Sequence, residues 1–331
     1  MRSRPLRLLS ALAAVLALAL VMAACGGDEG GGGETSTTGG PQSAETPDAK
    51  QIQADPANAS TTVTVGSKNF AEQYILGEIY AQTLEAAGFK VNKQLDLGSE
   101  QIAFKALRSG RIDAYPEYTG TALTSFYKIK TDDVPRDPQE SFDLLQSKLE
   151  GDEITGMPQT PFQNTYKITS TRETAEKYGN PKTITELAEK AGTDASISGF
   201  PECRQRTDCL LGLKQVYDWS PKFVSSQGQY SDLDKGQADF TFGFSTDGPL
   251  SLDKYVTYED DKQLFPPYYV SFMVRNEVHE KLGDAGLEAI EAVQEPLTEE
   301  VMQELNSRVT LDKEKPEQVA ADYLREAGFV K

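Results

Sequence analysis

The stretch 61–115 alternates short apolar strands with longer helical segments, and this order restricts the fold more than any other feature of the chain. Apolar residues recur at helical spacing over 70–87, and Gly88 can take the left-handed backbone that ends a helix. The expected elements are strands at 61–65, 91–95 and 112–115, a helix at 70–87, and a helix between Ser99 and Gly110. Strands joined by helices in this order predict a parallel α/β unit.

The same alternation returns after Thr160, so the sequence predicts a second α/β unit. Helices at 298–309 and 316–327 then close the chain, the second with Pro316 at its start and Gly328 after its end. From Pro266 onward, the pattern is interpreted as helical. The expected elements of the second unit are strands at 165–170, 195–198, 222–225 and 238–242 and helices at 185–191, 210–217 and 230–236. A cleft between two such units would bring strand ends from both around one ligand.

The N-terminus has the pattern of an export signal. Three arginines precede an apolar run over 8–24, which is short for a spanning helix and ends in small residues before Cys25. This arrangement is similar to a bacterial lipobox and predicts a lipoprotein signal peptide over 1–24, with lipid on the Cys25 sulfur. The alternative is ordinary cleavage with an incidental cysteine. The segment 25–60, rich in Gly, Ser, Thr, Pro and acidic residues, is expected to be a disordered tether.

Charge and cysteine content exclude several classes of function. The formal net charge of −18 argues against nucleic acid as a partner. With Cys25 lipidated, Cys203 and Cys209 remain in an exported protein, and a disulfide between them is the favoured interpretation. The single histidine, His279, lies in an acidic helical context that indicates a surface position. No metal site, cofactor or catalytic motif is expected, so the chain is predicted not to be an enzyme.

Two segments at strand ends carry side chains suited to ligand binding. In 66–76, a turn leads into a helix whose free amides favour an anion, and Lys68 adds a full positive charge. In 113–121, Tyr118 offers a ring face and Thr121 a hydroxyl. An exposed turn lysine and ordinary core packing are the alternatives for these residues.

These segments carry a resemblance to a known family. Gly-Ser-Lys-Asn-Phe at 66–70, Glu-Gln-Tyr-Ile-Leu at 72–76 and Tyr-Pro-Glu-Tyr-Thr-Gly-Thr at 115–121 look like the glycine betaine/carnitine/choline-binding family of ABC transporters. Further segments agree with it in order along the chain: 206–213, 245–248, 260–262 and 265–269. The resemblance implies a two-lobed periplasmic-binding-protein type II fold, each lobe a mostly parallel sheet flanked by helices. It also implies a ligand cleft between the lobes.

The resemblance also implies which residues line that cleft. Lys68, Thr121 and Arg206 correspond to positions that hold a ligand carboxylate, and Asn164 would contribute its backbone carbonyl. Gln73 is a weaker candidate beside them. The positions of an aromatic cage are occupied by Tyr118, Tyr166, Phe244 and Tyr268.

The chain departs from the family pattern at two places. Phe244 stands where a tyrosine is common, so the ring is kept and a hydroxyl is lost. The stretch 200–205 is longer than in simpler members, which leaves Arg204 and Arg206 as rival candidates; the spacing to Gly212 favours Arg206.

Physical chemistry suggests a ligand for such a cleft. A trimethylammonium group donates no hydrogen bonds and suits a box of ring faces, each contributing about 0.5–2 kcal/mol. Choline would leave Lys68 and Arg206 without an anion, whereas a betaine supplies its own carboxylate. Glycine betaine and related carboxylated osmolytes are therefore ranked above choline.

The predicted function is extracytoplasmic capture of a glycine betaine-type compound for an ABC importer. The chain would be a monomer, anchored to the cell membrane by lipid, that delivers ligand to the transmembrane permease subunits. The rivals are a sensory or enzymatic two-lobed binding protein for another small amine or amino acid. The expected lobes are 61–162 with 269–331, and 163–268.

Overall fold

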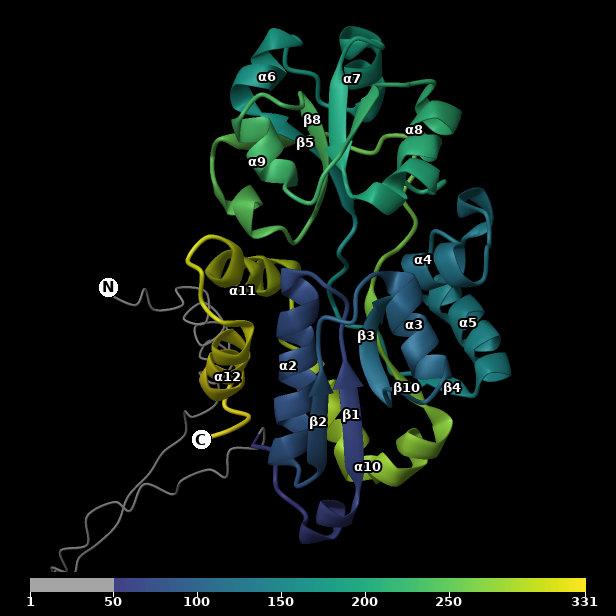
Figure 1. Cartoon of the computed structure of the whole chain (residues 1–331), viewed down its shortest axis with the longest axis vertical. Coiled ribbons are helices and arrows are strands. Elements are labelled where there is room, and N and C mark those ends of the chain that lie inside the picture. The colour runs from purple at the N-terminus through teal and green to yellow at the C-terminus, as the bar shows by residue number, and fades with distance from the viewer. Residues whose placement is uncertain (1–50) are drawn as a thin grey trace, which may run out of the picture. The chain divides into compact units, whose positions relative to one another are not determined.

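The structure is a computed structural model that describes residues 51–331. The expected signal peptide, Cys25 and the tether up to residue 50 lie outside the described residues. Figure 1 shows two sheets, each accompanied by its own helices. The two-lobed α/β architecture expected from the sequence is confirmed.

The first lobe is built on a five-stranded sheet with the order β2-β1-β3-β10-β4. Strand β1 runs parallel to β2 and β3, whereas β10 runs antiparallel to β3 and β4. Its strands are β1 (Thr62–Gly66), β2 (Lys90–Gln94), β3 (Ala114–Tyr118), β4 (Ile154–Gly156) and β10 (Val270–Arg275).

The second lobe repeats this plan in the order β7-β6-β8-β5-β9. Strand β6 is parallel to β7 and β8, and β5 is antiparallel to β8 and β9. Its strands are β5 (Tyr166–Thr171), β6 (Ser196–Gly199), β7 (Lys222–Ser225), β8 (Phe240–Phe244) and β9 (Tyr255–Thr257).

In each sheet four of the five strands run in the same direction and only β10 or β5 opposes them, which confirms the expectation of mostly parallel sheets. The chain passes between the lobes twice, after β4 and after β9. The first strand after each passage runs antiparallel to the central strand of the sheet that it joins. These pairs are β5 with β8 and β10 with β3. The parallel unit predicted from 61–115 accounts only for β1, β2 and β3.

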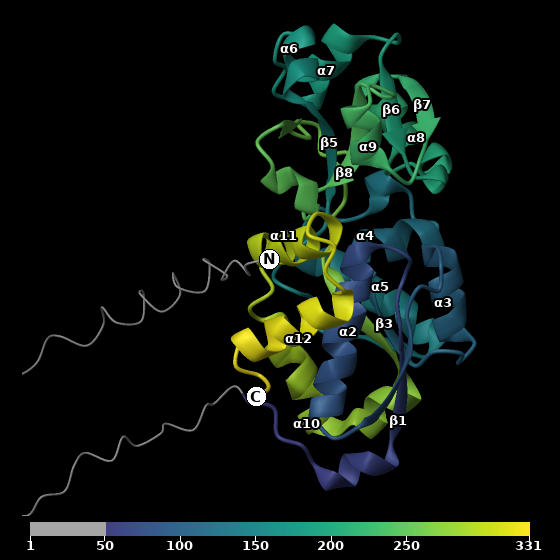
Figure 2. The same cartoon turned by 60° about the vertical axis from the view of Figure 1, so that its left-hand side comes forward.

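The helices surround the two sheets and close the chain (Figure 1). In the first lobe, α12 and α11 pack against α2, as the turned view in Figure 2 also shows for α12. The helices are α2 (Ala71–Ala86), α3 (Glu100–Arg108), α4 (Thr119–Thr121), α5 (Pro138–Leu149), α6 (Arg172–Lys177), α7 (Ile184–Ala191), α8 (Leu210–Tyr217), α9 (Gln229–Asp234), α10 (Asn276–Gln294), α11 (Glu299–Thr310) and α12 (Pro316–Glu326).

Several local predictions are confirmed at their boundaries. Gly88 follows α2 with a φ of 98°, and a side chain there would lie 2.6 Å from the Asp55 carbonyl oxygen. Pro316 begins α12, and Gly328 follows it with a φ of 82°. Glycine lacks a β-carbon, so it accepts this left-handed conformation at helix ends without strain.

The region after Pro266 is not helical throughout, contrary to the prediction. Residues 270–275 form β10, which lies between β3 and β4. Val270 to Val274 are buried, so this strand has nonpolar residues on both faces and shows no alternation. Such a run cannot be distinguished from a buried helix by periodicity.

Strand β3 also extends further than predicted and includes Tyr118. Pro116 lies within it, opposite Phe272 of β10. On its other side β3 pairs with β1 at Ala114 alone, so the missing N–H of Pro116 breaks no bond to β1. Tyr118 is therefore held by a sheet rather than by a loop.

Residues 51–60, which belong to the predicted disordered tether, have a defined structure. The Ile52 amide donates to the Phe329 carbonyl, and the Asp55 amide donates to the Ala87 carbonyl, at 3.0 and 3.1 Å. Residues Pro56–Ser60 form a 3-10 helix, and Asn58 bonds to the Ala87 carbonyl at 2.8 Å. This segment packs on the first lobe because backbone groups of α2 and the C-terminus bind it.

Within residues 51–331, no helix combines the length and the apolar character needed to cross a membrane.

Candidate functional site

An aromatic cluster lies where the second lobe meets the return passage to the first. The Tyr166 ring is central: its centroid lies 5.0 Å from Phe244, 5.1 Å from Phe265 and 5.5 Å from Tyr268. Phe200 is 6.3 Å from both Tyr166 and Phe244. We call these five residues the aromatic cluster. Three of them were predicted from the sequence, and Phe200 and Phe265 were not.

Neighbouring strands and a close backbone approach position the cluster. Tyr166 begins β5 and lies opposite Phe244 at the end of β8. Tyr268 comes from the return passage, whose backbone touches the start of α4. A β-carbon on Gly120 would lie 2.7 Å from the Pro267 carbonyl oxygen and 2.8 Å from the Tyr268 ring. Only glycine at position 120 lets these two segments meet this closely.

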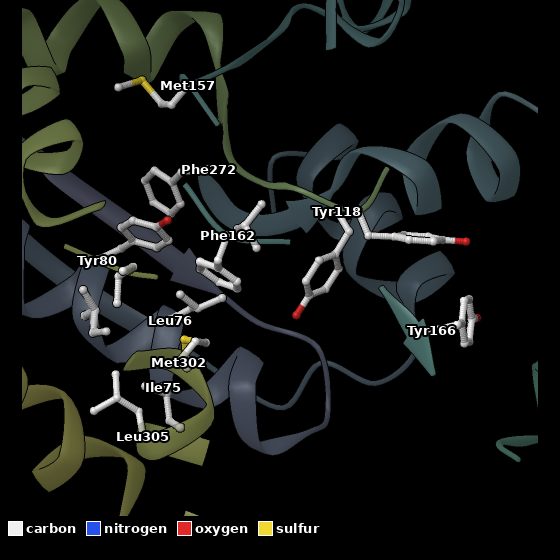
Figure 3. Packing of buried hydrophobic residues seen from close by; sticks show 14 of the residues in the cluster. Ile75, Leu76, Tyr80, Tyr118, Met157, Phe162, Tyr166, Phe272, Met302 and Leu305 are labelled. Atoms are coloured by element: carbon white, nitrogen blue, oxygen red, sulfur yellow. The ribbon is translucent and has the colours of Figure 1, made fainter. Parts of the chain in front are cut away.

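Tyr118, the fourth predicted cage residue, is placed differently. Its ring stacks on Phe70 with a centroid distance of 6.2 Å, and its hydroxyl donates to Glu72 at 2.7 Å. Figure 3 shows Tyr118 and Tyr166 away from the packed side chains of Ile75 and Tyr80. Among residues 51–331, the ring contact of Tyr118 is with Phe70, outside the aromatic cluster.

Lys68 is buried and paired. Its ammonium group donates to the carboxylate of Glu117, which is fully buried in β3. The ammonium also lies 4.3 Å from the Tyr118 ring centroid and 5.8 Å from that of Phe70. Burial lowers the pKa of Lys68, and Glu117 opposes this effect. The sequence predicted a cation here but gave no sign of its counter-ion.

Arg206 is likewise bound to acidic residues. Its Nε donates to Asp208 at 2.8 Å, its Nη2 also bonds to Asp208, and its Nη1 lies 3.5 Å from Glu100 of the first lobe. Asp208, 1% exposed, also accepts from the Tyr268 hydroxyl. Burial alone would raise the pKa of Asp208, but the Arg206 guanidinium holds that pKa below its ordinary value.

The rival Arg204 takes another position. Its guanidinium lies over the Phe223 ring at 5.1 Å, on an exposed part of the second lobe. The Arg206 guanidinium lies 6.0 Å from the ring of Phe200, a member of the aromatic cluster. Cys203 and Cys209 are joined by a disulfide, so Arg206 lies inside a short closed loop.

The remaining predicted residues flank Tyr118 and the first passage between the lobes. Thr121 ends α4, three residues after Tyr118, and is 8% exposed. The Asn164 amide donates to the Tyr268 carbonyl at 3.0 Å. Gln73 is fully buried and accepts from the Lys68 amide at 3.1 Å.

Sequence reasoning missed Glu72, which lies inside the quoted motif. Its carboxylate accepts from Tyr118, Asn164 and two further residues of distant segments. Burial raises the pKa of Glu72, and these four donors oppose the shift. Its position next to Gln73 could have indicated a role in the site. However, a glutamate in the first turn of a helix is commonly explained by its favourable interaction with the helix dipole.

A cavity of about 170 Å³ opens beside the return passage rather than at the predicted ligand residues. Its lining includes Arg136, Gln163, Asp260 and Tyr269. It meets the aromatic cluster at Phe265. The centroids of the other four rings of the cluster lie within 6.3 Å of the Tyr166 ring.

Together, the structure arranges the predicted residues in two neighbouring groups. One holds Tyr166, Phe244, Tyr268 and Arg206, and the other holds Lys68, Tyr118 and Asn164. Tyr268 links them, since its hydroxyl binds Asp208 and its carbonyl binds the Asn164 amide. Aromatic rings beside fixed ionic groups form a surface suited to an organic cation.

Comparisons with known proteins agree along nearly the whole described chain. The family described as the substrate binding domain of ABC-type glycine betaine transport systems matches residues 61–326. The glycine-betaine-binding protein of Pseudomonas aeruginosa is 31% identical over 278 residues, which cover 80% of this chain and 88% of that protein. The glycine betaine-binding protein YehZ of Escherichia coli is 26% identical over 296 residues, covering 83% of this chain and 94% of that protein.

A solved structure supports the same assignment. A crystal structure described as a glycine betaine/carnitine/choline ABC transporter superposes with a TM-score of 0.67 at 25% identity. The superposition covers 80% of this chain and 98% of that one. Because the family match includes both sheets and the residues around them, the chain belongs to the family of substrate-binding domains of ABC-type glycine betaine transport systems.

Proposed function

We propose that this protein captures a small quaternary-ammonium compound of the glycine betaine type outside the cytoplasm and delivers it to ABC permease subunits. The observation that carries the proposal is the aromatic cluster, with four rings around or beside Tyr166. The family supports the ligand class, since its members include glycine betaine-binding relatives. The protein releases its ligand unchanged, as expected of a transport component.

Ring faces provide the right chemistry for such a ligand. A trimethylammonium group is charged, bulky and weakly hydrated, and it donates no hydrogen bond. Each ring face within about 6 Å of it contributes about 0.5–2 kcal/mol. Micromolar binding requires about 8 kcal/mol after the costs of association. We therefore propose that Tyr166, Phe244, Tyr268 and Tyr118 hold the cation and that polar groups add the remainder.

The carboxylate of a betaine would bind on the basic side of the site. We propose Lys68, Thr121 and Arg206 as its ligands, with the Asn164 carbonyl on the methyl groups. Arg206 supports this because its Nη1 makes only a 3.5 Å ion contact to Glu100. The Lys68 ammonium, with three donor hydrogens, bonds to one carboxylate. Both side chains therefore retain donors.

The structure corrects one argument for the choice of ligand. The sequence-based ranking held that choline would leave Lys68 and Arg206 without an anion. In the structure Glu117 and Asp208 already neutralise them. Charge repulsion therefore no longer excludes choline, and the preference for a betaine depends on hydrogen bonds to its carboxylate.

Calorimetric titration of the purified protein tests the proposal. We expect saturable one-to-one binding of glycine betaine with a dissociation constant at or below the micromolar range. Titrations with proline betaine, carnitine and choline establish which group attached to the quaternary ammonium is preferred. Absence of binding to every quaternary amine would refute the proposed function.

The site of action is proposed from the N-terminal sequence. We propose cleavage of the segment 1–24, lipidation of Cys25 and a monomeric protein tethered to the outer face of the cell membrane. Lipidation predicts that the protein fractionates with membranes and that Cys25→Ser releases it. We also assign 61–162 with 269–331 to the first lobe and 163–268 to the second, as the membership of the two sheets supports.

A further inference from the structure

Glu72 is a buried carboxylate that joins several segments around the site. It lies in the first turn of α2 and is 3% exposed. Its Oε1 accepts from the Tyr118 hydroxyl at 2.7 Å and from Asn164 Nδ2 at 2.9 Å. Its Oε2 accepts from the Thr246 hydroxyl and from Asn306 Nδ2, the latter at 2.8 Å. The donors come from β3, the first passage, the loop after β8, and α11.

The donors around Glu72 favour its ionised form. A carboxylate offers about four acceptor positions, and four donors occupy them. Asn164 and Asn306 both turn their NH₂ groups toward it, while their Oδ1 atoms remain without a partner. A neutral carboxyl would have to donate one bond, which in this arrangement only the Tyr118 or Thr246 hydroxyl could accept.

A second carboxylate is bonded to a member of the aromatic cluster. Asp247, half-buried, accepts through Oδ2 from the Phe244 amide and from the Tyr230 hydroxyl, both at 2.8 Å. Each acid is thus bonded directly to one proposed cage residue: Glu72 to Tyr118 and Asp247 to Phe244. Burial raises the pKa of Asp247, and the charge of Glu72 adds to that effect.

Neither acid has a basic partner among residues 51–331. The two bases of the site are engaged elsewhere, Lys68 with Glu117 and Arg206 with Asp208. An unpaired charge in a buried position is unfavourable, and the protein retains such groups chiefly where function uses them. Above about pH 7, where Asp247 is ionised as well as Glu72, the site therefore has an excess of negative charge beside its aromatic residues.

We propose that Glu72 and Asp247 are the counter-charge of the ligand's quaternary ammonium, and that they make the site select a permanent cation over an uncharged group of the same shape. This inference rests on the proposed function. Glu72 acts partly through Tyr118, because a phenol that donates to a carboxylate gains electron density on its ring face. The bound cation supplies the positive charge that the folded protein lacks beside these acids.

An isosteric ligand pair isolates this effect. Glycine betaine and tert-butylacetate have the same shape and carboxylate but differ in a charged nitrogen or a neutral carbon. The measured quantity is the ratio of their affinities, determined by calorimetry for wild type and variants. In Glu72→Gln we expect this ratio to fall by at least about tenfold, because a full charge next to the cation is lost.

Two features keep the variants folded. In Glu72→Gln, the Asn164 and Asn306 amides can rotate and offer their unbonded Oδ1 atoms to the new NH₂ group. In Asp247→Asn, a single amide oxygen can accept both bonds that Oδ2 now accepts. Asp247→Asn should lower the ratio by about threefold, since Asp247 is less buried. Glu78 is a buried acid of the same helix as Glu72 and is paired with Lys93 of β2, so Glu78→Gln is the matched control with an unchanged ratio.

The outcomes separate the two proposals. If wild type binds glycine betaine and both variants lower the ratio, the counter-charge is supported. If wild type binds but the ratio is unchanged in both variants, the counter-charge is wrong and the proposed function stands. If the variants lose affinity equally for both ligands, these acids only hold the fold, and the inference is again wrong. If wild type binds no quaternary amine, the proposed function itself fails.

Discussion

The ammonium group of Lys68 is bound to the carboxylate of Glu117, 49 residues away in the chain, and both side chains are buried. Glu117 also accepts from the Tyr118 amide and the Tyr115 hydroxyl, each at 2.8 Å. The pair fixes the lysine beside the ring of Tyr118. Lys68, which was expected to bind a ligand carboxylate, therefore already has an anionic partner within the protein.

Removing this internal partner should shift ligand preference toward carboxylated compounds. In Glu117→Gln the Lys68 ammonium lacks a counter-ion, so a ligand carboxylate becomes its best acceptor. We expect the affinity ratio of glycine betaine to choline to rise about tenfold, the effect of one charge-assisted hydrogen bond. Calorimetry with both ligands measures it. Glu117→Asp, which retains the charge, is the control, and an equal ratio in the two variants would contradict the role of the pair.

The two arginines of the disulfide-closed loop should differ sharply. Arg206→Lys loses the forked contact with Asp208 and the reach of Nη1, so glycine betaine affinity should fall by about 10- to 100-fold. Arg204→Lys changes a side chain that lies over Phe223 and should leave affinity within about twofold. Equal losses of affinity in the two variants would show that Arg206 is not the specific ligand of the betaine carboxylate.

Tyr166 should contribute through its ring rather than its hydroxyl. Tyr166→Leu keeps a nonpolar side chain but removes the central ring face, and affinity for quaternary amines should fall by about 3- to 30-fold. Tyr166→Phe keeps the ring and should bind nearly as well as wild type. The comparison requires both variants to unfold near the wild-type temperature. Similar binding by the leucine and phenylalanine variants would argue against cation binding at this ring.

Stability should depend on pH through Asp247. Burial raises the pKa of this group to about 7 from 3.8. The folded state therefore binds its proton more tightly than the unfolded state does. This contribution to stability is fully present below about pH 3.8 and is lost as pH rises to about 7.

Urea unfolding of wild type and Asp247→Asn at pH 5 and pH 8 measures this effect. The fall in the free energy of unfolding between these pH values should be smaller in the variant by about 2 kcal/mol. Other carboxylates titrate in both proteins and cancel in the comparison. Parallel pH profiles would show that Asp247 titrates as it does in the unfolded chain.

Local signals in the sequence were sufficient for much of the first lobe. The signals for β1 and α2 involve residues close together in the chain, so both elements could be placed from the sequence. They are the alternation of apolar residues in 62–66, the helical spacing in 71–86 and the helix-ending Gly88. Strand β10 could not, because both of its faces are buried and its pairing with β3 joins residues about 150 positions apart. The pairing of Val270 in β10 with Tyr118 places Tyr118 at the end of β3.

Candidate site residues followed the same division. The family resemblance implied Tyr166, Phe244 and Tyr268, and the structure brings their rings into contact around Tyr166. The neutralisation of Lys68 by Glu117, and the four bonds of Glu72, depend on tertiary pairing. No pattern of adjacent residues reveals whether a buried charge has a partner. The charge balance of the cleft, and thus its preference among ligands, required the fold.

The most direct test of the account is a crystal structure of the protein grown with glycine betaine. The account predicts the trimethylammonium group within about 6 Å of the ring centroids of Tyr166, Tyr268 and Phe244, with the carboxylate on Arg206. A structure in which glycine betaine binds elsewhere while these rings keep their present mutual contacts would contradict it.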